Sequence, residues 1–147
     1  TSHAPWTPLP RIVEWGEIGD GRIFDGTQRD GSTPREVWSN PDTIRVQYSA
    51  ALDYALEITG QYIARDGGDT LFIVLGDHQP VPLLTGQHAP PDVPIHIISR
   101  DRALLNRLPD AYFSQGMIPR ADMSVLPMQE IRAMMATVFE TPTGETR

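Results

Sequence analysis

The sequence predicts an α/β fold with a mainly parallel sheet. Residues 71–75 (Leu-Phe-Ile-Val-Leu) form a continuous apolar run. The run is too short for a helix, so it indicates a strand buried on both faces, as in parallel sheets. A long amphipathic helix is predicted directly before it, and a second apolar strand after it. A helix that leads into a buried strand is half of a parallel crossover unit, which gives the fold class.

The chain opens with segments that do not favour regular structure. Residues 1–10 are rich in proline, which removes a backbone donor and restricts the preceding residue, so an ordered loop is expected. Residues 16–40 combine glycines with scattered charges and are expected to form a long irregular connection. The three tryptophans of this region, Trp6, Trp15 and Trp38, are expected to pin it to the body of the protein rather than to line a cleft.

The clearest helix begins after Asn40. This residue can act as the N-cap, and Pro41 suits the first helical turn. Apolar residues then recur at three- and four-residue spacing from Ile44 to Ile63, which predicts one broad apolar face. The pair Gly67-Gly68 is expected to end the helix just before the central strand.

The remaining elements follow a loop that contains several prolines. Residues 93–99 predict a second strand with Pro94 near its start, residues 101–108 a short helix, and residues 128–139 a helix with three methionines as core residues. No internal repeat is visible. Residues 1–147 are therefore expected to belong to one domain.

Composition excludes several classes of protein. The 147 residues carry a net charge of −7, which argues against nucleic acid as a partner because phosphate binding needs clustered Lys and Arg. There is no Cys, so disulfides and thiolate metal sites are excluded. No apolar run approaches the roughly 18 to 20 residues that span a bilayer, so the chain is expected to be soluble.

Two polar residues, Asp77 and His78, follow the central strand immediately after Gly76. Open α/β sheets place their ligand sites beyond the carboxyl ends of the strands. A carboxylate oxygen and a neutral imidazole suit Zn or Mn better than Ca or Mg. The alternative from these residues alone is that Asp77 caps a turn and His78 is a polar surface residue.

The order of motifs points to a family. Ser2-His3 stands in a proline-rich loop, and residues 46–63 belong to a predicted helix that contains Asp53-Tyr-Ala. Residues 69–78 contain the predicted strand, which is followed by Gly-Asp-His. This order resembles the later part of the alkaline phosphatase and sulfatase superfamily. It is most similar to the membrane-anchored sulfatase-like branch, which includes lipoteichoic acid synthases and phosphoethanolamine transferases. The resemblance covers roughly the first two thirds of the chain.

The resemblance implies a fold, a cofactor and an activity. The fold would be part of a three-layer alkaline phosphatase-like sandwich, with this chain as the C-terminal part of the domain. Asp77 and His78 would bind a divalent metal ion (Zn, Mn, Mg or Ca), and His3 would face the phosphate or sulfate group of an ester substrate. The parent protein would be a hydrolase or phosphotransferase on the extracytoplasmic face of a bacterial-type membrane. Its nucleophile is expected upstream of Thr1 and its membrane anchor in a missing part of the parent chain, so this chain alone would have little or no activity.

Other positions extend or weaken this assignment. His88 lies in the loop after the central strand, where it could approach the metal or remain solvated. Asp92-Val-Pro stands where the family has His-Val-Pro, so Asp92 is another possible ligand. Gln79-Pro80 follows the metal pair where the family often has Gly. These departures leave open an alternative, a non-catalytic binding or scaffold domain that keeps the fold without the chemistry.

Overall fold

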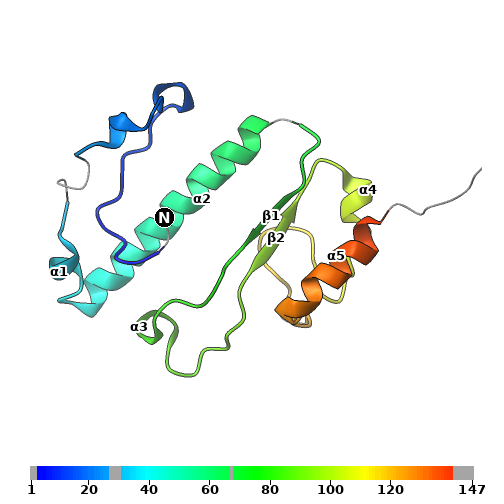
Figure 1. The fold of residues 1–147 in the computed structure, drawn as a ribbon. Coiled ribbons are helices and arrows are strands. Elements are labelled where there is room, and N and C mark those ends of the chain that lie inside the picture. Colours follow the sequence, from blue (N-terminus) through cyan, green and yellow to red (C-terminus); the bar gives the residue numbers. More distant parts are fainter. Residues whose placement is uncertain (1–2, 27–30, 67, 141–147) are drawn as a thin grey trace, which may run out of the picture. The chain divides into compact units, whose positions relative to one another are not determined.

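The structure is a computed structural model that describes residues 3–26, 31–66 and 68–140. The chain divides into two compact units, which are described one at a time (Figure 1). The first unit comprises residues 1–67 and 81–87, and the second comprises residues 68–80 and 88–147. None of the helices in the described ranges combines the length and the apolar character that crossing a membrane requires.

The first unit is built on one long helix. Its elements are η1 (Trp15–Glu17), η2 (Arg22–Phe24), α1 (Pro34–Val37), α2 (Pro41–Asp66) and α3 (Pro82–Thr85). The predicted start of α2 is confirmed, because the side-chain oxygen of Asn40 accepts the N–H of Asp42 at 2.8 Å. The predicted stop at Gly67-Gly68 falls partly outside the described residues, since Gly67 is not among them.

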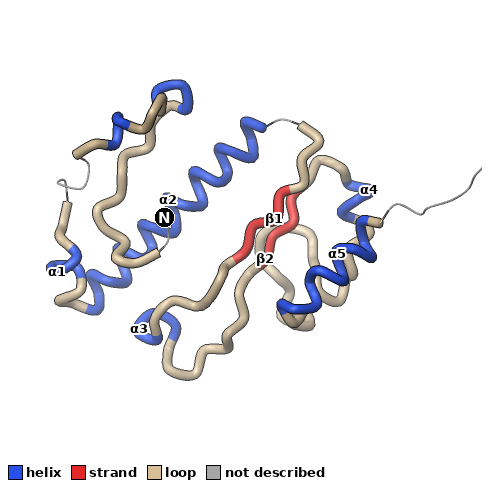
Figure 2. The backbone as a smooth tube through the Cα atoms, in the orientation of Figure 1, coloured by secondary structure: helices blue, strands red, loops and turns tan. Residues whose placement is uncertain are grey.

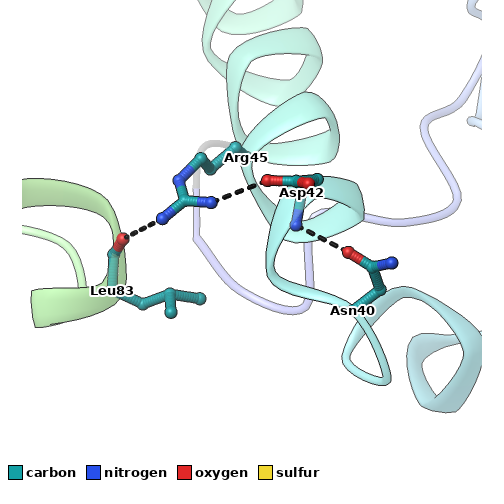
Figure 3. A network of polar contacts seen from close by, with 4 residues as sticks. All are labelled: Asn40, Asp42, Arg45 and Leu83. Carbon is teal, nitrogen blue, oxygen red and sulfur yellow. Dashed lines mark hydrogen bonds and ion pairs between the residues drawn. The ribbon is translucent and has the colours of Figure 1, made fainter.

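A polar network connects the first turn of α2 to α3 (Figure 3). Arg45 donates to the carboxylate of Asp42 at 2.8 Å and to the carbonyl oxygen of Leu83 at 3.5 Å. The ion pair is exposed, so it contributes little free energy by itself. The hydrogen bond to Leu83 places the Arg45 side chain against α3, 38 residues further along the chain.

The core of the first unit joins the N-terminal loop to α1 and α2. Trp6, Val37, Ile44 and Ala51 are buried together. The Trp6 ring stacks on Trp38 at a centroid distance of 5.4 Å and meets Tyr48 edge-on at the same distance. The expectation that tryptophans pin the irregular N-terminal region to the body is confirmed.

The second unit contains a two-stranded antiparallel sheet, shown in red in Figure 2. Strand β1 (Phe72–Leu75) pairs with β2 (Ile95–Ile98), and the register places Phe72 opposite Ile98 and Leu75 opposite Ile95. Both predicted strands therefore exist. The predicted three-layer α/β sandwich with a mainly parallel sheet is wrong, because the only sheet in the described residues is this antiparallel pair and their other regular elements are helices.

Two features explain the error. A parallel return requires a crossover that runs back along the strand, but residues 76–94 contain only the four-residue α3. The side chains of β1 also alternate in exposure, with Ile73 at 45% and Leu75 at 48%. The apolar run is thus a half-exposed strand, although its sequence is that of a strand covered on both faces.

Short helices complete the second unit: α4 (Arg102–Leu105), η4 (Met128–Glu130) and α5 (Ile131–Phe139). The carboxylate of Asp101 accepts the N–H of Leu104 at 3.0 Å and so caps α4. Arg107 donates to the carbonyl oxygen of Glu140 at 2.7 Å, which ties the chain after α4 to the end of α5 (Figure 1). The predicted helices at both places are confirmed, the first shorter than expected.

Replacing Val37 by Ala should destabilise the first unit by roughly 1 to 3 kcal/mol, because the side chain is 0% exposed and its methyl groups would leave a cavity. The matched control is Val46→Ala on α2, which is 64% exposed and should change stability by less than about 0.5 kcal/mol. Urea unfolding followed by tryptophan fluorescence measures this unit specifically, because all three tryptophans lie within it. Equal effects of the two substitutions would contradict this core.

A capping box starts α1. The Thr33 hydroxyl accepts the N–H of Glu36 at 3.3 Å, and the Glu36 carboxylate accepts the N–H of Thr33 at 2.7 Å. The hydrogen bond from the Thr33 backbone, followed by that from its side chain, lowers the pKa of Glu36 below 4.5. These bonds favour the ionised carboxylate in the folded state.

The contribution of Glu36 to stability should therefore depend on pH. It is fully present above the ordinary pKa of a glutamate carboxyl and is lost as the pH falls through the lower pKa of the folded state. The difference in unfolding free energy between the natural chain and Glu36→Gln should shrink over that acidic range. A difference that stays constant or grows on acidification would show that the carboxylate does not act in this way.

Candidate metal site at the end of strand β1

The candidate site begins where β1 ends. The N–H of Gly76 donates to the carbonyl oxygen of Pro94 at 3.0 Å, which extends the pairing one step beyond Leu75 and Ile95. A Cβ atom on Gly76 would lie 3.2 Å from the Cβ of Val93. A residue larger than glycine would therefore require Val93 to shift by a few tenths of an ångström. The chain turns away immediately after Gly76.

Asp77 and His78 occupy this turn and are brought together by local hydrogen bonds. One carboxylate oxygen of Asp77, Oδ1, accepts the backbone N–H of His78 at 3.0 Å. The other, Oδ2, lies 3.6 Å from Nε2 of His78. The remaining ring nitrogen, Nδ1, lies 2.8 Å from the carbonyl oxygen of Gln79. Each side chain thus has one atom engaged with the backbone and one atom directed at its neighbour.

The remaining two atoms form an ion pair when the imidazole is protonated, and with a neutral imidazole their spacing is close to that of two ligands of one cation. Donors at about 2.0 to 2.1 Å from a tetrahedral ion are separated by roughly 3.3 Å. The observed 3.6 Å between Oδ2 and Nε2 requires only a small side-chain rotation to reach this value. The side chains are 86% and 66% exposed, so an ion would reach them directly from solvent.

Only two ligands meet at this point. Within the described ranges, no three side chains of His, Cys, Asp or Glu are grouped closely enough to hold an ion. Asp92 comes near the turn through its backbone, since its carbonyl oxygen accepts a hydrogen bond from the Gln79 side chain. His88 is exposed in a turn of the loop. The possible roles of His88 and Asp92 as further ligands remain predictions.

His3 belongs to the first unit, whereas Asp77 and His78 belong to the second. Its side chain is exposed, and Nδ1 lies 2.8 Å from the carbonyl oxygen of Ala4. Ser2, the other half of the Ser-His motif, falls outside the described residues. A role for His3 in contacting substrate remains a prediction.

Sequence reasoning missed the part played by Gln79, which it treated only as a departure from a family pattern. In the structure this residue contacts the His78 ring through its backbone and the Asp92 backbone through its side chain. The sequence feature that could have pointed to this role is Pro80, because a proline favours an extended backbone at the residue before it. A residue held extended directly after a turn is well placed to reach the segment that precedes β2, which contains Asp92.

Comparison of the chain with protein-family models, with curated proteins and with solved structures returned no match.

Replacing Gly76 by Ala should weaken the hairpin by roughly 1 to 3 kcal/mol, because the new methyl group would press against Val93. Faster hydrogen exchange at the amide of residue 76, which donates to Pro94, would report this directly. The control is Gly60→Ala in α2, where a Cβ meets nothing within 4 Å and helix propensity should add about 1 kcal/mol. Unchanged exchange at residue 76 would contradict the close approach.

Proposed function

We propose that this chain supplies Asp77 and His78 to the divalent-metal centre of a phosphate- or sulfate-ester hydrolase or transferase. The observation that carries the proposal is the 3.6 Å separation of Asp77 Oδ2 and His78 Nε2, with the other atom of each side chain held by the backbone. The order of the Ser-His loop, the Asp-Tyr-Ala helix and the Gly-Asp-His strand supports the ester chemistry.

The donor set narrows the choice of metal. One carboxylate oxygen and one imidazole nitrogen suit Zn or Mn, whereas Ca and Mg prefer shells made of oxygen. Held by Asp77 and His78, such an ion would supply the positive charge that polarises an ester and stabilises an attacking hydroxyl group. The task of Asp77 and His78 is to hold the ion, and the proposed task of His3 is to contact the phosphate or sulfate oxygens.

A complete centre would need further ligands and a nucleophile beyond Asp77 and His78, because no group of three candidate ligands is found within the described residues. The chain by itself should therefore bind metal weakly and show little or no turnover. Within this proposal the parent protein acts on the extracytoplasmic face of a membrane, as the resembled sulfatase-like branch does.

A second candidate function is a non-catalytic binding or scaffold domain. The observation that favours it is the local hydrogen bonding of the turn. Asp77 Oδ1 accepts the N–H of His78, and His78 Nδ1 lies within hydrogen-bond distance of the Gln79 carbonyl oxygen, without any ion. The two side chains would then stabilise the turn and bind no ion. The presence or absence of metal binding separates the two functions.

The proposal is tested by calorimetric titration of the chain with Zn²⁺ and Mn²⁺, with Mg²⁺ and Ca²⁺ for comparison. Asp77→Asn and His78→Ala should each weaken binding by at least about tenfold, because each removes one of two ligands. Asp69→Asn, an exposed carboxylate before β1, is the matched control and should leave binding unchanged. His88→Ala and Asp92→Asn test the two possible further ligands. Equal affinity in the natural chain and both ligand variants would refute the assigned pair.

A further inference from the structure

Gln79 makes two polar contacts in different directions. Its backbone carbonyl oxygen lies 2.8 Å from Nδ1 of His78. Its side-chain amide donates to the backbone carbonyl oxygen of Asp92, which is 13 residues further along the chain. The residue is half-buried, unlike the exposed Asp77 and His78 before it. Gln79 therefore lies between the candidate ligands and the segment that leads into β2.

The backbone contact fixes the proton of the imidazole ring. A carbonyl oxygen can only accept, so Nδ1 of His78 must carry the hydrogen in this contact. In the neutral ring the lone pair is then on Nε2, the nitrogen that lies 3.6 Å from Asp77 Oδ2. A backbone carbonyl that selects the tautomer in this way is a recurrent feature of metal-binding histidines.

The side-chain contact fixes the direction of that carbonyl. Pro80 already restricts the backbone of Gln79 to extended conformations, and the bond to Asp92 fastens the residue to the opposite segment. On the other side of the turn, the N–H of Gly76 is bonded to Pro94. The turn that carries Asp77 and His78 is thus anchored at both ends to the chain before β2.

We propose that Gln79 is a positioning residue for the Asp77–His78 pair: its side chain, bonded to Asp92, aims its own carbonyl at Nδ1 of His78 and so keeps Nε2 free beside Asp77. The functional role of Gln79 in this inference rests on the proposed metal function. Its structural content, the tautomer of His78 and the dependence of that tautomer on the Gln79 side chain, is measurable without any metal.

The test uses Gln79→Met, which keeps the length of the side chain and removes the donor. The primary measurement is the long-range ¹H–¹⁵N spectrum of the histidine rings in the metal-free, ¹⁵N-labelled chain. Natural His78 should be the Nδ1–H tautomer, and the substitution should move its population toward Nε2–H. The rings of His88 and His96 should not change. Gln61→Met is the matched control, because Gln61 also donates its side-chain amide, to Glu57 at 3.2 Å, but on α2.

A second measurement is the Zn²⁺ affinity of the same variants. Gln79→Met should weaken it by about tenfold or more, as is usual when a residue that orients a metal ligand is removed. Gln79→Glu offers a second variant of similar size should the methionine form fold poorly, since its ionised carboxylate also lacks a donor and faces the Asp92 carbonyl.

The outcomes separate the two proposals. An Nε2–H tautomer in the natural chain, or a tautomer that ignores both Gln79 substitutions, would overturn the inference whatever the metal affinity. A tautomer shift with no Zn²⁺ binding by the natural chain would uphold the positioning and reject the metal function. A tautomer shift with unaltered Zn²⁺ affinity would overturn the role of Gln79 in the metal site.

Discussion

The pairing of β1 with β2 is the constraint on which the candidate site depends. The antiparallel register that ends at Leu75 and Ile95 brings Gly76 against Val93 and Pro94. It also brings Gln79 within reach of the Asp92 carbonyl. Without this alignment the residues after β1 would have only one another as partners. Local hydrogen bonds set the geometry of Asp77 relative to His78, and the strand pairing anchors the two ends of the turn that carries them.

The local features of the chain could be predicted from sequence because their causes are local. Asn40 and Pro41 mark a helix start through hydrogen bonding and a fixed backbone angle, and Asp101 does the same for α4. The strands around Ile73 and Ile97 could also be predicted locally, because each is a short apolar run. The turn at Asp77 and His78 follows from Gly76, which ends the strand.

Strand direction could not be predicted in this way. A run such as Leu-Phe-Ile-Val-Leu looks the same in a parallel sheet and in a half-exposed hairpin, because both require apolar, extended residues. What decides between them is the path of residues 76–94, where α3 is too short to form a crossover. The contact between Gln79 and Asp92 depends on the same path of the chain. The sequence therefore predicted neither the antiparallel direction of the strands nor this contact.

The adjacency of Asp77 and His78 in the chain has a thermodynamic consequence. Ligands drawn from distant segments meet only after folding, so an ion that binds them stabilises the folded state strongly. Two neighbouring residues are close in the unfolded chain as well, and an ion that also binds the unfolded state shifts the folding equilibrium less. If the pair binds an ion as proposed, that binding would be coupled to folding mainly through Gln79 and its bond to Asp92. Metal affinity and thermal stability would vary almost independently at such a site.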